Sequence, residues 1–526
     1  QSEITGGTAS ITNMESYESA DTLATFVRIG SIPLTLQEVS SNIVGAQLGH
    51  DAITTSLYAA ILGLVLLCVF MIAVYRIPGV VATIALWIYT AGVLILVSVY
   101  DLTLTLPGIA GIILGIGMAV DANVIIFARI REEIASGKTV RSAIDVGFKK
   151  ALSAIVDGNV TTLIAALVLG LKGSGTVKGF AQTLALGIVL SMFTALVITR
   201  MILKALYAVG LKDEKFYGKA KDRKTVDFLA KKKIFFTISL VMIIGGFVCM
   251  GVNKGTSGTA LNYSLDFVGG TSTNVTFNED MDLAALDSQV VPVIEKITKD
   301  ANVQVQKVAG GNQVIFKTRT LDVEERQALT EALVENFGVN SDLITAETIS
   351  STISSEMRSD AIVAVVIAAI CMLLYIWFRF KDIRFATSSV AALIHDVLVV
   401  LAFYAVARVS VGSTFIACML TIVGYSINAT IVIFDRIREN LGAMTKKDDL
   451  EQLVNRSISQ TLSRSIFTSL TTFFMVAALF VLGVSSIREF ALPLMVGIVC
   501  GTYSSVCITG ALWYVLRTKI GTKKNK

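Results

Sequence analysis

The sequence predicts a polytopic α-helical membrane protein with two pseudo-symmetric helical halves and a small α+β ferredoxin-like domain outside the membrane. Only 16% of its 526 residues are charged and 54% are hydrophobic, with a mean hydropathy of +0.70, whereas soluble domains carry about 25% charged residues. The apolar residues fall in eleven runs, each long enough to cross a hydrocarbon core of about 30 Å. One block of sequence occurs twice, as expected for transporters built from repeats.

The eleven apolar runs predict eleven membrane-spanning helices. The run that begins at 153 is the least regular, because Asp157 and Asn159 interrupt its start. The predicted spans are 54–75, 79–99, 105–128, 153–171, 179–208, 234–252, 361–379, 385–407, 412–434, 466–484 and 489–515.

The repeated block has a polar residue at the same place in each copy. GIGMAVDANVIIFARIREEI begins at Gly115, and IVGYSINATIVIFDRIRENL lies about 307 residues later. Asp121 aligns with Asn428, and Gly117 with Gly424. Each polar residue follows its glycine by four positions and therefore shares its helix face. Two further matches, at an offset of 310, extend the repeat: 151–169 with 461–474, and 179–189 with 489–499.

Positive charge gathers between alternate runs, which by the positive-inside rule predicts that these segments are cytoplasmic. The connector 209–233 and the tail 516–526 are the most basic. The hydrophilic stretch 253–357 then lies outside. Its order of strands and helices suggests a ferredoxin-like sandwich. We expect strands at 262–267, 271–277, 302–308, 312–318 and 343–348, and helices near 284–299 and 322–337.

These observations divide the chain into seven parts. Residues 1–52 read as the end of a first external domain, and we expect a longer or processed protein because the chain begins with Gln1 and shows no signal peptide. The other parts are a five-helix half at 53–208, the cytoplasmic connector 209–233, a helix at 234–252, the external domain 253–357, the remaining helices at 358–515 and the cytoplasmic tail 516–526.

Asp121 is the first candidate functional residue, because a carboxylate inside a membrane helix is costly and ion coupling is its default interpretation. The alternative is a structural hydrogen bond to the other half. Arg464 begins the paired helix near the cytoplasmic third of the membrane. It is either a counter-charge for Asp121 or a side chain that reaches the lipid headgroups.

Other polar residues are candidates for ion coupling or for helix packing. Asp396 lies next to His395 in the middle of an apolar run. The pair either relays protons, or its two side chains simply satisfy each other's hydrogen-bonding groups. Asp157 is either functional or a cap at a helix start. Asn428 can hydrogen-bond between helices but cannot titrate. Gly117 and Gly424 allow close approach at helix interfaces.

Several classes of function lack their signatures. All six cysteines lie in apolar runs, and two histidines cannot build a zinc site. The sequence has no Walker A loop, HExxH or GxSxG motif. We therefore expect no enzyme, metal or cofactor. The basic loops lack an RNA-binding aromatic pattern and suit lipid headgroups or a cytoplasmic partner, not nucleic acid.

The motifs resemble one family. GIGMAVDANVIIFARIREE resembles the fourth-helix signature of SecD, while SLDFVGGT (264–271) and GYSINATIVIFDRIREN (424–440) resemble SecF signatures. The whole chain resembles a fused SecD–SecF protein of the resistance–nodulation–division superfamily. TGGTASITN (5–13) and VRIGSIPLTL (27–36) resemble the end of the first SecD external domain, so the resemblance implies that the first helix and most of that domain are missing.

The resemblance implies an accessory subunit of the bacterial Sec machinery in the cytoplasmic membrane. Such a subunit uses the proton or sodium gradient to help late translocation and release of unfolded preproteins. Its partners are a SecYEG-type translocon, accessory membrane subunits, the preprotein and the bilayer. Two alternatives stay open: a small-molecule or lipid exporter of the same superfamily, and a passive scaffold of the export channel.

The resemblance also assigns residues. The family's ion path comprises an Asp of the fourth helix, an Asp of the tenth and an Arg of the eleventh. The first corresponds to Asp121 and the third to Arg464. The second is absent, because this chain has Asn428-Ala429-Thr430 where many members have Asn-Asp-Thr. Either Asp121 works with Arg464 alone, or Asp396 takes part, or coupling is altered.

Overall fold

The computed structural model describes residues 16–17, 20–21, 23–25, 40–43, 46–173, 175–220, 225–300, 303–307, 312–445 and 448–521. Within these ranges eleven helical segments are long and apolar enough to cross a membrane, which confirms the predicted number. In the first half they are α2 (Ala46–Tyr75), α3 (Ile77–Val99), α4 (Leu106–Ala135), α5 (Val140–Lys172) and the continuous α6 (Gly175–Phe193), η1 (Thr194–Ile198) and α7 (Thr199–Val209). The others are α9 (Lys232–Ser257), α14 (Ser351–Phe380), α15 (Ile383–Ala407), α16 (Ser413–Gly442), α17 (Leu450–Leu482) and the continuous α18 (Ser485–Tyr503), η4 (Ser504–Thr509) and α19 (Gly510–Gly521).

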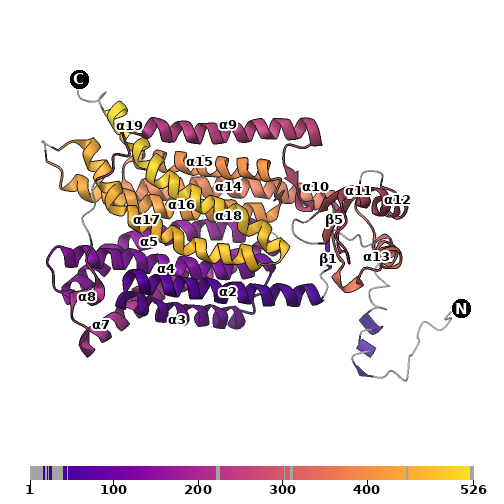
Figure 1. Cartoon of the computed structure of the whole chain (residues 1–526), viewed down its shortest axis with the longest axis horizontal. Helices are drawn as coiled ribbons and strands as arrows, with labels where there is room; N and C mark the ends of the chain where they lie inside the picture. The colour runs from indigo at the N-terminus through magenta and orange to yellow at the C-terminus, as the bar shows by residue number, and fades with distance from the viewer. Residues whose placement is uncertain are drawn as a thin grey trace, which may run out of the picture.

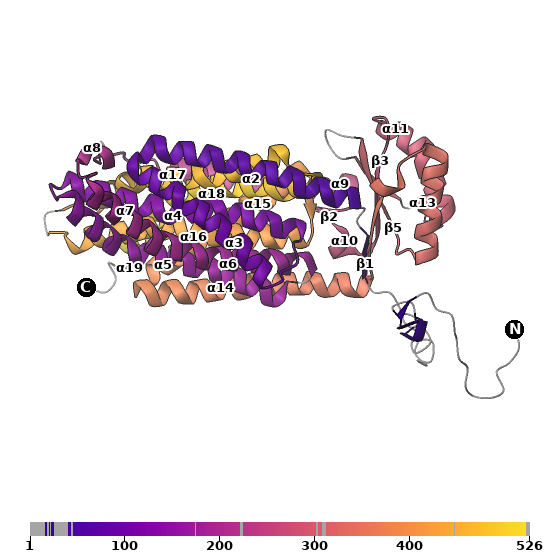
Figure 2. The same cartoon turned by 90° about the horizontal axis from the view of Figure 1, so that it is seen from below.

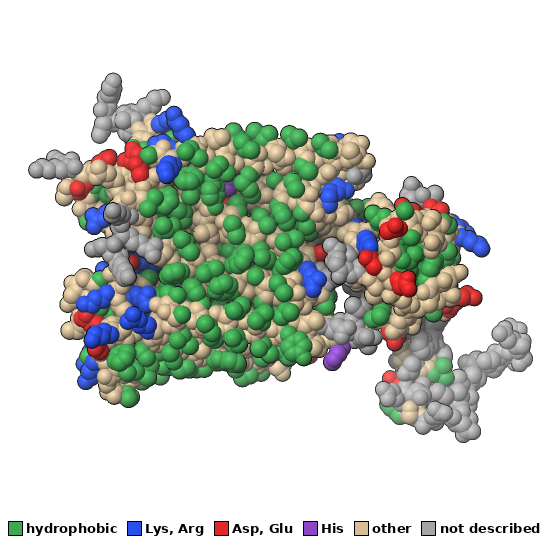
Figure 3. All heavy atoms as spheres, viewed as in Figure 1, with side chains coloured by type: hydrophobic (Ala, Val, Ile, Leu, Met, Phe, Trp, Pro, Cys, Tyr) green, Lys and Arg blue, Asp and Glu red, His purple; other side chains and the backbone are tan. Residues whose placement is uncertain are grey.

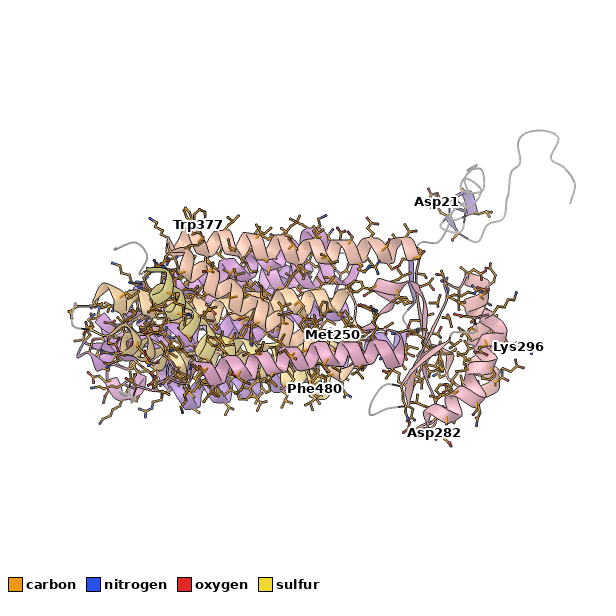
Figure 4. The ribbon with its side chains drawn as sticks, turned by 90° about the horizontal axis from the view of Figure 1, so that it is seen from above. Asp21, Met250, Asp282, Lys296, Trp377 and Phe480 are labelled. Atoms are coloured by element: carbon orange, nitrogen blue, oxygen red, sulfur yellow. The ribbon has the colours of Figure 1, made fainter. Side chains whose placement is uncertain are left out.

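The membrane helices form one elongated bundle, and the small α+β domain projects from one end of it (Figure 1). Hydrophobic side chains cover the flank of the bundle, while Lys and Arg gather mainly at the end opposite the small domain (Figure 3). Trp377 points away from the bundle near that end of α14 (Figure 4). This distribution suits a bundle whose flank meets lipid, since tryptophan is enriched at membrane interfaces and basic residues are enriched in the segments on one side of the membrane.

The two central helices are the copies of the repeated block. α4 and α16 are the most buried of the spans and lie in the middle of the bundle. α4 packs against α17 of the other half, and α16 packs against α5. These two pairs are equivalent under the repeat, so the interface between the halves is pseudo-symmetric.

The small domain has the predicted ferredoxin-like topology. Its antiparallel strands are β3 (Gly270–Thr276), β4 (Gln304–Lys307), β5 (Gln313–Thr318) and β6 (Thr345–Ile349), in the order β6-β3-β5-β4. The helices α11 (Leu283–Ala285), η2 (Leu286–Val290), α12 (Val291–Thr298) and α13 (Val323–Phe337) pack on the sheet. They cover the face that points away from the bundle (Figure 2).

One predicted strand of this domain was wrong. In 262–267, only Asn262 and Tyr263 are extended, as β2, and they pair in parallel with β7 (Ser410–Val411) beside the bundle. The next residues form the short helix α10 (Leu265–Val268). Gly269 and Gly270 follow with φ of 80° and 116°, a region that favours glycine, and they turn the chain into β3.

A strand from far upstream completes the sheet. β1 (Ser40–Ile43) pairs antiparallel with β6, so it becomes the edge of a five-stranded sheet. Most of 1–52, the expected remnant of a first domain, lies outside the described residues. The sheet therefore contains chain from both sides of the first membrane half.

The small domain is also joined to the central helix α16. The Asp266 carboxylate accepts hydrogen bonds from the backbone N–H and the hydroxyl of Ser413, at 2.7 and 2.6 Å. Ser413 is the first residue of α16. A carboxylate satisfies the free N–H groups of a helix start and interacts favourably with its dipole. The domain is thus fixed to the helix that carries Asn428.

Candidate functional site

The aligned polar residues of the repeat meet at the centre of the bundle. Asn428 Nδ2 donates to Asp121 Oδ2 at 2.5 Å. Asp121 is 6% exposed, and its Oδ1 has no hydrogen-bond partner. The Asn428 amide occupies space that Gly158 of α5 leaves open, because a Cβ at that position would overlap it. Sequence reasoning missed Gly158, since its repeat equivalent is a threonine and no motif marks it.

The aligned glycines hold the two halves close together. A Cβ on Gly117 would lie 3.1 Å from Cα of Thr472, and one on Gly424 would lie 3.2 Å from Cα of Thr162. The two threonines are themselves equivalent in the repeat. Each central helix therefore rests a glycine on the backbone of a helix from the other half, which places Asp121 and Asn428 within reach of each other.

A reciprocal ion-pair network lies two to three turns further along the central helices. Arg129 pairs with Glu439 at 3.1 Å, and the equivalent Arg436 pairs with Glu132 at 2.7 Å. Each arginine also bonds the glutamate of its own helix at 3.0 Å. The two arginines and the two glutamates align in the repeated block, but none of them is among the predicted site residues. Equivalent residues pair crosswise because the two halves are related by a pseudo-twofold axis, and the alignment alone does not show how the halves face each other.

Arg464 breaks the symmetry of this network, because the equivalent residue in the first half is Ala154. It lies fifteen residues into α17, so the expectation that it begins a helix was wrong; Asp449 caps that helix instead. Arg464 is 4% exposed and therefore does not reach lipid headgroups. Its Nη2 donates to Glu132 at 3.2 Å, and its Nε is buried without a hydrogen-bond partner.

A small cavity separates Arg464 from Asp121. Both residues line it, together with polar groups of α16 and α17. The centre of a water molecule can occupy about 10 Å³ inside it, which is room for about one water. No ion pair joins the two side chains among the described residues; Arg464 rests on Glu132. The remaining lining residues are Tyr425, Asn428, Ala429, Val432, Ser465 and Thr468.

Asp396 lies apart from this site, within the second half. Its carboxylate is fully buried between α15, α16 and α18 and bonds His395 Nδ1 at 2.9 Å. Ser426, two residues before Asn428, donates to it at 2.5 Å. Asp396 does not touch Asp121, but α16 connects the two groups.

Asp157 is not a helix cap. It lies in the middle of α5, whose N-cap is Thr139. Its carboxylate pairs with Arg379 Nε of α14 at 2.6 Å and accepts a hydrogen bond from the Tyr375 hydroxyl at 2.9 Å. Arg379 also donates to Ser153. The residue therefore links the outer helix α14 to α5, a partner more than 200 residues away that no local pattern indicates.

This geometry defines a class of protein: a membrane protein of two related halves, with a buried carboxylate and a buried arginine at their interface. Residues 30–209 and 329–519 match the family described as Protein export membrane protein SecD/SecF, C-terminal. Since this match covers more than half of the chain, the protein belongs to the SecD/SecF family.

Relatives of known name agree with this assignment. The protein translocase subunit SecDF of Bacillus subtilis is 35% identical over 520 residues, which cover 94% of this chain and 68% of the relative. That of Thermus thermophilus is 37% identical over 525 residues, covering 97% and 68%. This chain thus spans about two thirds of their length.

Solved structures share the fold. The crystal structure of SecDF from Thermus thermophilus, described as a translocon-associated membrane protein, superimposes with a TM-score of 0.84 at 35% identity, covering 98% of this chain and 69% of that one. A SecDF crystal structure in a super-membrane-facing form gives 0.72 at 33% identity, covering 97% and 68%.

Proposed function

We propose that this protein is an accessory subunit of the Sec protein-export machinery that uses a proton or sodium gradient to assist late translocation and release of unfolded preproteins. The observation that supports this most directly is the contact of Asp121 with Asn428 across the two halves, deep in the bundle. The names of the relatives support the export role and disfavour the exporter and scaffold alternatives. It acts without cofactor and without a catalytic role of its own.

In this proposal Asp121 binds and releases the coupling ion, and Arg464 responds. With Asp121 neutral, Arg464 stays on Glu132. With Asp121 ionised, its negative charge attracts Arg464 across the cavity, because a buried charge without a partner is costly. Since the buried guanidinium has an unpartnered Nε, it has one N–H available for a second carboxylate. Arg464 thereby exchanges between two carboxylates of α4.

Movement at this site reaches the small domain through the central helix α16. Asn428 lies near the middle of α16, and Asp266 of the domain binds its first residue. A shift of α16 relative to α4 therefore moves the domain as well. The domain lies outside the bacterial cytoplasmic membrane, where it contacts chain that emerges from a SecYEG-type translocon and its accessory subunits, and the basic end of the bundle faces the cytoplasm.

The test is release of a preprotein from energised membrane vesicles that carry the protein. We would compare wild type with Asp121→Asn and Ala429→Asp, using Asp145→Asn, a half-exposed carboxylate, as the control. Asp121→Asn should abolish gradient-dependent release, and Asp145→Asn should not. Ala429→Asp shows whether a second carboxylate beside Asn428 adds to the effect. If Asp121→Asn releases preprotein as wild type does, the coupling proposal falls and a passive scaffold replaces it.

A further inference from the structure

The second half contains a fully buried carboxylate that the coupling site does not use. Asp396 lies near the middle of α15 and is 0% exposed. Side chains from α15, α16, α18 and η4 surround both of its oxygens with donors. They are His395 Nδ1 at 2.9 Å and Cys500 Sγ at 3.3 Å on Oδ1, and the hydroxyls of Ser426 at 2.5 Å and Ser504 at 2.8 Å on Oδ2.

The charge of this carboxylate has no permanent partner. Among the described residues, only His395 forms an ion pair with Asp396, and it does so only when protonated. The other titratable groups that face the pair are the thiol of Cys500 and the ring of Tyr503, whose centroid lies 6.3 Å from that of His395. No Lys, Arg, Asp or Glu on the described parts of α9, α14, α16, α18 or α19 is paired with either residue.

Two charge states of the pair follow from these contacts. With neutral His395 and ionised Asp396, the four donors satisfy the carboxylate but the pair carries one buried negative charge. With one more proton, the pair has no net charge. A low-dielectric interior favours the uncharged state, whereas the four donors favour the charged one. Each of the two charge states therefore has contacts that suit it.

A purely structural hydrogen-bond network does not account for His395. Its Nδ1 bonds Asp396, but its Nε2 is buried and has no partner. In a network with only a structural role, buried polar atoms normally all have hydrogen-bond partners. Nε2 instead provides a position where a proton can arrive while Nδ1 passes its own proton to Asp396.

The polar residues around Asp396 are not repeated at the equivalent positions of the first half. Under the offsets of 307 and 310, the positions of Ser426, Cys500 and Ser504 correspond to Ala119, Leu190 and Thr194 in the first half. The second half thus has a polar pocket where the first is mostly apolar. On the central helices the situation is reversed, since α4 carries Asp121 and α16 carries the non-titrating Asn428. Among the described residues, each half therefore has a buried carboxylate without a permanent basic partner, Asp121 in the first half and Asp396 in the second, and the two lie in different places.

We propose that His395 and Asp396 form a second proton-binding site, connected to the first through α16. A proton that arrives at Nε2 of His395 releases the proton on Nδ1, which passes along the existing hydrogen bond, 2.9 Å between its heavy atoms, to Oδ1 of Asp396. One proton has been taken up, and both residues end neutral. Loading turns Asp396 Oδ1 from an acceptor into a donor, and the same carboxyl group bonds Ser426 of α16 through Oδ2. The site does not depend on the export function.

The experiment is pH-difference infrared spectroscopy of the intact protein in lipid nanodiscs, which detects the C=O stretch of protonated carboxyl groups. Wild type should show a band that Asp396→Asn loses and Asp121→Asn keeps. Cys500→Ser should shift that band, because a hydroxyl donates a stronger hydrogen bond than a thiol. Cys418→Ser, a change at another buried cysteine, should leave it in place.

The result that overturns the proposal is an unchanged set of carboxyl bands in Asp396→Asn, with secondary structure and elution volume as in wild type. If Asp396→Asn does not fold, absence of any band shift in Cys500→Ser is equally decisive against it. Loss of the band on addition of sodium at constant pH would assign the site to a metal cation instead. A failed preprotein-release assay leaves these spectra unaffected, so the two proposals fail separately.

Discussion

Gly158 of α5 leaves the space that the amide of Asn428 occupies, 270 residues later in the chain. A methyl group at Gly158 would overlap that amide, so Gly158→Ala should displace Asn428 from Asp121. Alanine stabilises a helix by about 1 kcal/mol relative to glycine, yet overpacking typically destabilises by about 1–3 kcal/mol. We expect Gly158→Ala to lower the free energy of unfolding and to reduce gradient-dependent preprotein release.

The matched control for this change is Gly245→Ala in α9, where an added Cβ meets nothing within 4 Å. It should keep release at the wild-type level and leave stability unchanged or slightly higher. Equal behaviour of the two variants would contradict the close fit at Gly158.

Glu132 and Glu439 occupy equivalent positions, but only Glu132 also binds Arg464. Glu132→Gln should leave a buried guanidinium without its partner and destabilise by about 3 kcal/mol. Glu439→Gln should destabilise by no more than about 1 kcal/mol, because its side chain is 39% exposed and Arg129 retains Glu132. Denaturant titration in mixed micelles measures both. Equal losses would mean that Arg464 does not depend on Glu132.

Two ion pairs join α5 to α14, and their burial differs. Asp157–Arg379 is mostly buried, whereas Lys172–Asp360 has side chains that are 42% and 38% exposed. A double-mutant cycle with Asp157→Asn and Arg379→Gln should give a coupling free energy of about 1–3 kcal/mol. The cycle with Lys172→Gln and Asp360→Asn should give less than about 1 kcal/mol. The interpretation of Asp157 as the link to α14 fails if the two coupling energies are the same.

Glu347 on β6 predicts a pH dependence of the small domain. Burial, with the nearby Asp266 carboxylate, raises the pKa of Glu347 to about 7 from the usual 4.5. Because the folded pKa is above the unfolded one, the folded domain is favoured below pH 4.5 and loses stability as the pH rises toward 7. At about 1.4 kcal/mol for each pKa unit, the loss is at most about 3.5 kcal/mol, and Glu347→Gln should remove it.

Hydrogen exchange of the β3 and β5 amides in the intact protein, corrected for intrinsic rates between pH 5 and 8, measures this effect. Glu325→Gln is the control. The hydrogen bond from Arg319 lowers the pKa of Glu325, so its contribution is lost only as the pH falls below the unfolded pKa, and this variant should keep the wild-type decline between pH 5 and 8. Protection of Glu347→Gln that still declines toward pH 8 would show that another group titrates.

The sequence predicted the architecture well, because periodic apolar runs and an internal repeat are long-range signals. The eleven spans and the ferredoxin-like order follow from them. Contacts between distant residues could not be predicted from these signals. The contacts of Arg464 with Glu132 and of Asp157 with Arg379 depend on how the helices are rotated about their axes. The strand expected at 262–267 failed because Ser264 starts a helical turn and two glycines with positive φ follow it.

The pairing of β1 with β6 ties the two halves together outside the bundle. Cutting the polypeptide within the connector between α7 and α9 would divide the chain into two fragments that still share one sheet. The upstream fragment would donate its strand to the downstream fragment, as in fragment complementation. Co-expression of such fragments would therefore rebuild the domain edge only when residues 40–43 accompany the first fragment.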